Sequence, residues 1–173
     1  MNLVKRKNNI KTFINSTIER HPVPILGIDY KVKIVYKNIK ITELNVEGRT
    51  IKISLPNSYK KIANSSILDL AIDKMYEQIA KIEVERAMEK TRIMLGFAPD
   101  EYEIRKIKAL GKCENNKITI NPEIVMYNRK IIDYVVLHQY CHLKYKTHSK
   151  SFMKMIEKYE PNYKQCEEVL LNI

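Results

Sequence analysis

The 173-residue sequence is poor in several residue types, and each shortage narrows the class of protein. It has no tryptophan, four glycines and three cysteines, namely Cys113, Cys141 and Cys166. An odd number of widely spaced cysteines is typical of reduced thiols and argues against a disulfide framework. No apolar run approaches the ~20 residues of a transmembrane helix, and the basic start, residues 1–7, lacks the apolar stretch of a signal peptide. We therefore expect a cytoplasmic protein that does not associate with membranes.

The chain nevertheless contains enough apolar sequence for a folded core. Hydrophobic residues make up 45% of it and charged residues 29%, which is typical of a soluble globular protein. The length corresponds to one domain, or to one domain with an N-terminal subdomain. We predict a basic leader and antiparallel meander over residues 1–61, and a helical metal-binding domain over residues 62–173.

This division rests on a change in the apolar pattern. Apolar and polar residues alternate over residues 28–34, 39–46 (with one phase slip) and 51–55, which predicts three strands. From Ser66 to Leu95 there is neither glycine nor proline, and apolar residues recur at helical spacing. This predicts a long helix that ends at Gly96. The sequence therefore indicates an α+β fold.

The net charge of +11 is concentrated near the N-terminus. Residues 1–61 carry 13 Lys and Arg against 4 Asp and Glu, whereas the remaining 112 residues carry 18 against 16. Such asymmetry occurs in proteins that bind nucleic acid, but it also occurs on strands whose lysines are simply solvated. The basic residues are not interleaved with the aromatic residues that single-strand binders use. We therefore favour solvated strands over a nucleic-acid partner.

The most informative segment is His138-Gln139-Tyr140-Cys141-His142, followed six residues later by His148. Histidines four residues apart share one face of a helix, so two imidazoles can bind one metal ion. The preceding segment, residues 131–137, is apolar enough to bury that helix. A chain leaving the helix could bring His148 back as a third ligand.

The alternative is a purely structural cluster of histidines in the core. The concentration of three of the four histidines within eleven residues makes a metal site the better interpretation. For Cys141, which lies three residues after His138, a small core thiol is the favoured role. Asp133 is a candidate hydrogen-bond partner for a ligand imidazole.

The C-terminal motifs resemble those of a known family. Residues 27–171 resemble the YgjP-like (DUF45, or WLM-related) zinc metallopeptidases, which are related to the SprT-like proteases. The resemblance is carried by five segments in the family's order: Ala-Leu-Gly-Lys-Cys at 109–113, Ile-Thr-Ile-Asn at 118–121, Val-Val-Leu-His-Gln-Tyr-Cys-His-Leu at 135–143, His-Ser-Lys-Ser-Phe-Met at 148–153 and Pro-Asn-Tyr at 161–163.

This resemblance implies a zincin-like metallopeptidase fold, with Zn²⁺ held by His138, His142 and His148. It also implies a peptide or protein substrate, hydrolysed by metal-activated water. The family's motif is HExxH, and the Glu that acts as general base is replaced here by Gln139. A carboxamide keeps the shape of that base but cannot accept a proton near neutral pH. We therefore expect the chain to be inactive as it stands.

Two explanations of Gln139 remain open. It could be a substitution introduced to trap substrate in an otherwise active hydrolase, which the intact motif favours. It could also mark a natural pseudopeptidase, a binding module with a structural metal and a basic surface for nucleic acid or an acidic protein. For the hydrolase we expect an extended peptide to add as a strand beside Ile118, Thr119 and Ile120, in a strand predicted to lie at the edge of its sheet.

Overall fold

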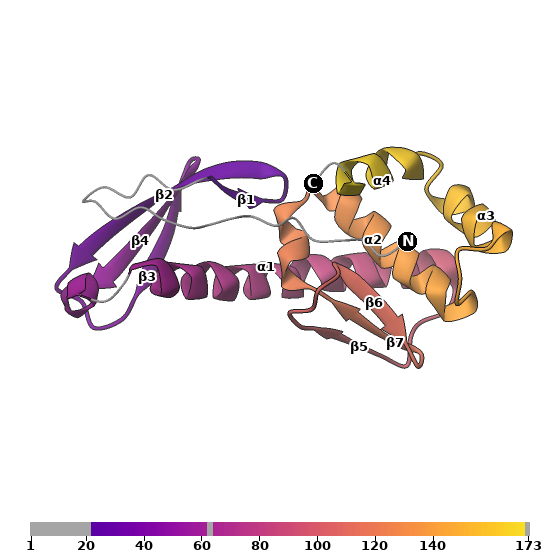
Figure 1. Ribbon diagram of the computed structural model, residues 1–173, viewed down its shortest axis with the longest axis horizontal. Coiled ribbons are helices and arrows are strands. Elements are labelled where there is room, and N and C mark those ends of the chain that lie inside the picture. Colours follow the sequence, from indigo (N-terminus) through magenta and orange to yellow (C-terminus); the bar gives the residue numbers. More distant parts are fainter. Residues whose placement is uncertain (1–21, 62–63, 172–173) are drawn as a thin grey trace.

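The structure is a computed structural model that describes residues 22–61 and 64–171. Figure 1 shows an elongated molecule with the first sheet at one end, and the second sheet and the C-terminal helices at the other. Helix α1 (Asn64–Leu95) runs along both parts. The predicted α+β class and the predicted long helix are confirmed. The boundary between residues 61 and 62 stays a prediction, although α1 begins close to it.

The first sheet has the order β1-β2-β4-β3. Its strands are β1 (Val23–Ile25), β2 (Ile28–Lys37), β3 (Glu43–Glu47) and β4 (Thr50–Pro56). The prediction of an antiparallel meander was wrong, because β4 lies between β2 and β3 and pairs with β2 in parallel. Burial explains this order. Ile51, Ile53 and Leu55 of β4 are at most 1% exposed, whereas all five residues of β3 are exposed at the edge.

The second sheet has the order β5-β7-β6. Its strands are β5 (Glu101–Ile104), β6 (Gly111–Glu114) and β7 (Lys117–Ile120). Asn115 and Asn116, both with positive φ, form the two-residue turn between β6 and β7. The central strand is therefore β7, with β5 parallel to it on one side and β6 antiparallel on the other.

Three further helices complete the fold. They are α2 (Arg129–Lys144), α3 (Lys150–Tyr159) and α4 (Tyr163–Leu171), and short 3-10 segments cover Asn57–Lys61 and Pro122–Met126. Among the described residues, no helix combines the length and apolar character that crossing a membrane requires.

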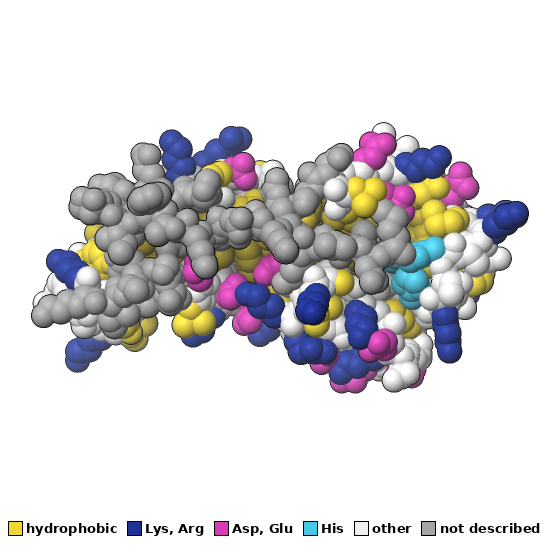
Figure 2. Space-filling view, in the orientation of Figure 1, with side chains coloured by type: hydrophobic (Ala, Val, Ile, Leu, Met, Phe, Trp, Pro, Cys, Tyr) yellow, Lys and Arg dark blue, Asp and Glu magenta, His cyan; other side chains and the backbone are white. Residues whose placement is uncertain are grey.

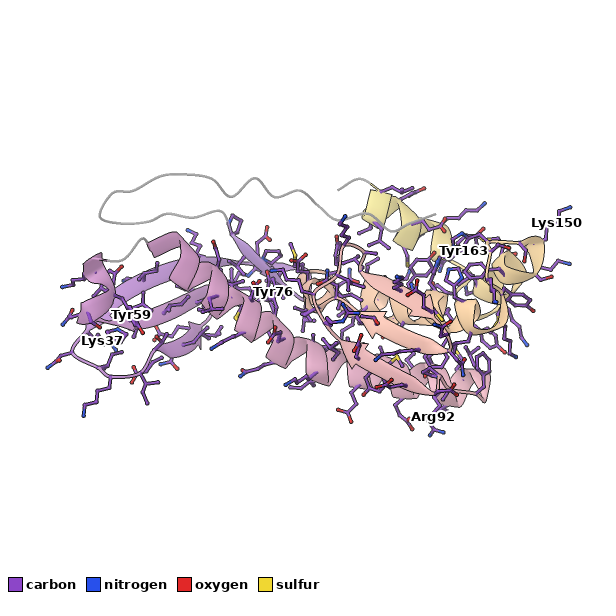
Figure 3. The ribbon with its side chains drawn as sticks, turned by 60° about the horizontal axis from the view of Figure 1, so that its bottom comes forward. Lys37, Tyr59, Tyr76, Arg92, Lys150 and Tyr163 are labelled. Atoms are coloured by element: carbon purple, nitrogen blue, oxygen red, sulfur yellow. The ribbon has the colours of Figure 1, made fainter. Side chains whose placement is uncertain are left out.

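Side-chain contacts attach α1 to both parts of the molecule. The Tyr76 hydroxyl (labelled in Figure 3) donates a hydrogen bond to the Pro24 carbonyl of β1 at 2.9 Å. Further along α1, Glu83 accepts hydrogen bonds from the Arg129 guanidinium at the start of α2, the shortest at 2.6 Å. Because Glu83 is only 4% exposed, this ion pair fixes α2 against α1 in a partly desolvated setting.

Candidate metal centre

Helix α2 carries two of the predicted ligands, the buried His138 and the half-buried His142. The Asn128 side chain caps the helix by accepting a hydrogen bond from the Ile131 N–H at 3.1 Å. Every residue from Tyr134 to Cys141 is buried. His138 and His142 lie one turn apart on this helix, and their ring centroids are 5.0 Å apart. The local sequence therefore dictates the shared face, and the packing of α2 holds that face in place.

The chain after α2 brings His148 back to the pair. The helix ends where the Tyr145 N–H donates to the Cys141 carbonyl, and α3 begins at Lys150 with Ser149 as its N-cap. His148 lies just before that cap. Its Nε2 is 3.0 Å from His138 Nε2, and the candidate ligand atoms of the three histidines all lie within 4.8 Å of one another. Figure 2 shows histidine side chains at the surface in this part of the molecule.

One aromatic ring contacts all three imidazoles. The Phe152 ring centroid lies 5.0, 4.8 and 4.7 Å from those of His138, His142 and His148, and Phe152 is fully buried. Phe152 is thus an apolar wall of the cluster, a role that the sequence analysis did not assign to it. Its position four residues after His148, in the first turn of an amphipathic helix, was the available signal.

The protonation state of the histidines suits a metal. Burial lowers the pKa of His138 from 6.5 to about 3, and burial also lowers the pKa values of His142 and His148. All three rings are therefore neutral at pH 7, which is the form that binds a metal. The His142 Nδ1 lies 3.0 Å from the Tyr145 carbonyl. If Nδ1–H donates there, Nε2 keeps its lone pair for a ligand bond.

The close approach of His138 and His148 is compatible with an ion of the size of zinc. Two imidazole nitrogens bound tetrahedrally to one zinc ion, each at about 2.0–2.1 Å, lie about 3.3–3.4 Å apart. The 3.0 Å between the Nε2 atoms of His138 and His148 requires only a small adjustment. The Nδ1 of His138 is buried without a hydrogen-bond partner among the described residues. This ring therefore lacks the supporting acceptor that His142 has.

Asp133 and Cys141 lie on the same helix as His138 and His142, but neither supports a ligand. The guess that Asp133 supports a ligand imidazole was wrong, because its carboxylate accepts 2.6 Å hydrogen bonds from Arg86 and Lys90 of α1. Cys141 is fully buried, and burial raises the pKa of its thiol to about 12. It therefore packs as a small core residue, the role that the sequence analysis favoured.

The strand expected to take up peptide is not an edge strand. Ile118, Thr119 and Ile120 lie in β7, which has a hydrogen-bonded neighbour on each side and is almost fully buried. The error arose because strand order is not encoded in one strand's own pattern. The edge strand that packs against α2 is β6, and its Gly111 lies directly against the Gln139 side chain.

A groove of about 580 Å³ lies elsewhere, along the outer face of α1 and beside Tyr102. It contains none of the three histidines, nor Gln139. The chemical character of the histidine cluster, rather than the size of a cavity, therefore identifies the candidate site.

Comparison with protein families agrees with this chemistry. A family model described as "YgjP-like, metallopeptidase domain" matches residues 2–172. Among solved structures, the metallopeptidase zymogen of Pyrococcus abyssi abylysin is 27% identical, with 51% of this chain and 92% of that chain covered and a TM-score of 0.47. The metallopeptidase zymogen of Methanocaldococcus jannaschii jannalysin is 17% identical, with 51% and 94% covered and a TM-score of 0.46. The comparison with curated proteins found no match.

Proposed function

We propose, given that this chain belongs to the YgjP-like metallopeptidase family, that His138, His142 and His148 hold a zinc ion at a peptide-binding site. We also propose that Gln139 leaves this site without its general base. The family implies a metal ion and a peptide or protein substrate. The observation that carries the proposal is the mutual approach of the three candidate ligand atoms, all within 4.8 Å.

The residues around the cluster have distinct roles in this proposal. A zinc ion with three imidazole ligands supplies Lewis acidity to a carbonyl oxygen and lowers the pKa of water. The Tyr145 carbonyl orients the His142 ring, and Phe152 excludes water from one side of the three imidazoles. Both effects favour a fixed, partly dry site, in which electrostatic interactions are stronger than in water.

The peptide would bind along β6. This strand is at the edge of its sheet and packs against the helix that carries His138 and His142. An extended segment can therefore continue the sheet through main-chain hydrogen bonds. Lys112 and Glu114 of β6 are exposed and form an ion pair at 2.7 Å. They therefore lie where they could contact the side chains of a bound peptide.

Gln139 sets the expected rate. The carboxamide can hold a water molecule by hydrogen bonds, but it cannot remove its proton near neutral pH. General-base catalysis is worth ~10²–10⁴-fold. The present chain should therefore bind peptides while cleaving them slower than a Glu variant by about that factor.

The test is Gln139→Glu, assayed on a panel of unfolded proteins. Cleavage should appear, should be abolished by a zinc chelator, and should exceed that of the unchanged chain by about two orders of magnitude or more. The matched control is the double variant Gln139→Glu with His142→Ala, which restores the carboxylate but removes a ligand. A folded, zinc-loaded Glu variant that cleaves nothing would contradict the enzymatic proposal.

The missing general base at position 139 is also compatible with a second function, that of a non-catalytic peptide-binding module. In that case the unchanged chain binds unfolded segments at the metal site, and the Glu variant gains no activity. Equilibrium binding of a fluorescent peptide to the two forms, measured beside cleavage, separates the two functions. Equal binding with cleavage by the Glu form alone supports the hydrolase.

A further inference from the structure

Gly111 differs from the other glycines of the chain. Gly27, Gly48 and Gly96 have φ values of +80°, +58° and +74°, which residues other than glycine rarely adopt. Gly111 has no such φ, because it lies in β6 and pairs with Ile120. Its backbone conformation would accept any L-residue. The absence of a side chain at this position therefore needs another reason.

The reason is the Gln139 side chain. A Cβ atom added at Gly111 would lie 3.0 Å from both Cγ and Nε2 of Gln139, and 3.1 Å from its Cδ. Carbon atoms in contact are normally about 3.5–4.0 Å apart. Gln139 is only 3% exposed and lies in the middle of a buried run of α2. Its side chain thus fills the space that a side chain at position 111 would take.

We propose that Gly111 is a positioning residue, which provides a slot on β6 that holds the side chain of residue 139 between α2 and the edge strand. Glu has nearly the same shape as Gln, so the slot would hold a carboxylate in the same place. The packing part of this inference stands on the contacts alone, whereas its catalytic meaning rests on the proposed function.

The sign of a stability change tests the packing. At a compatible φ, Gly→Ala normally stabilises a protein, because it restricts the unfolded chain. With Gln139 present, Gly111→Ala should instead lower the melting temperature, because the new methyl group displaces Gln139. In a Gln139→Ala background the space is open, so the same substitution should leave the melting temperature unchanged or raise it.

Gly48→Ala is the matched control. Gly48 has a positive φ, but nothing lies within 4 Å of the added Cβ, and it sits in the turn between β3 and β4. Its effect on the melting temperature should be the same in the unchanged chain and in the Gln139→Ala background. If Gly111→Ala fails to fold only when Gln139 is present, the coupling is equally established. Equal effects of Gly111→Ala in both backgrounds, or failure to fold in both, would overturn the inference.

The kinetics of the Gln139→Glu enzyme test whether Gly111 positions residue 139 for catalysis. Adding Gly111→Ala should lower kcat at least tenfold, with zinc content retained and KM changed by less than about threefold. A purely structural defect would instead reduce the amount of folded protein and leave kcat per folded molecule unchanged. If Gln139→Glu is inactive, the proposed function fails while the melting-temperature cycle still decides whether Gly111 holds residue 139.

Discussion

The edge strand β3 of the first sheet and the histidine-bearing helix α2 are packed in opposite ways. All five residues of β3 are exposed, including Leu44 at 38% and Val46 at 53%. In α2, by contrast, eight consecutive residues from Tyr134 to Cys141 are buried, so the middle of that helix is packed on every side. A surface strand tolerates changes of side chain, whereas a helix whose middle is enclosed holds the imidazole of His138 in a fixed position. The difference indicates where this molecule keeps a fixed geometry.

The burial of charged side chains also differs between the first sheet and α2. Lys31, Lys33 and Lys37 of β2 are exposed. Near α2, acids and bases are matched across elements, as in the bidentate contact of Arg129 with the buried Glu83. Exposed ion pairs contribute little to stability, whereas breaking a buried one leaves an uncompensated charge. The electrostatic contacts that matter for the fold therefore lie between α1 and the start of α2.

The largest effect should come from removing a ligand. His142→Ala should abolish stoichiometric zinc binding, because two imidazoles no longer form the three-ligand set of an open zinc site. Elemental analysis and the zinc-induced rise in melting temperature measure this. Val46→Ala is the control from the exposed strand and should retain one zinc ion per chain. Full zinc content in the His142 variant would exclude the proposed site.

Truncating a side chain should lower the free energy of unfolding much more in α2 than on β3. Ile132 is fully buried in α2, so Ile132→Ala should lower the free energy of unfolding by about 2–5 kcal/mol. Val46 on β3 is half exposed, and Val46→Ala should change it by less than about 0.5 kcal/mol. Denaturant titrations measure both values. Similar losses in the two variants would remove the contrast between the regions.

Acid should destabilise the metal-free protein through the buried histidine. Burial lowers the pKa of His138 to about 3, whereas an unfolded histidine titrates near 6.5. Below pH 6.5 His138 therefore binds a proton in the unfolded chain, whereas in the folded chain it stays neutral until the pH approaches 3. The stability contributed by neutral His138 is present above pH 6.5 and falls as pH drops, by up to about 1.4 kcal/mol for each pH unit.

The control for this acid effect is His138→Asn, which removes the titrating group. Its stability should fall less steeply between pH 6 and pH 4, as followed by denaturant titration in the presence of a chelator. An unchanged slope would mean that other groups cause the acid sensitivity.

The smallest effect should be seen with DNA. If the lysines of the first sheet are only solvated, affinity for duplex or single-stranded DNA should be weak and lost at moderate salt. Replacing Lys31 and Lys33 by Gln should then leave zinc content and melting temperature nearly unchanged. A salt titration of DNA binding is the measurement. Tight binding that survives physiological salt would assign a function to the basic sheet.

Much of the candidate site was predictable because its signals are local. The spacing of His138 and His142 depends only on the helical period, and the apolar residues before them predicted a buried helix. The return of His148 was predictable only as a possibility, since the turn and the Ser149 cap had to fold it back. Phe152 and Gly111 were missed because their roles depend on contacts with residues distant in the sequence or on another element.

The sequence by itself determined the α+β class, the long helix and the set of histidines, because helical and strand periods are properties of neighbouring residues. Only the tertiary structure decided the strand orders, with β4 between β2 and β3 and with β7 at the centre of its sheet. Strand pairing joins residues far apart in the chain, and it is selected by how much apolar surface the whole arrangement buries. For the same reason, β6 rather than β7 became the edge beside the histidines, and Gly111 became the neighbour of Gln139.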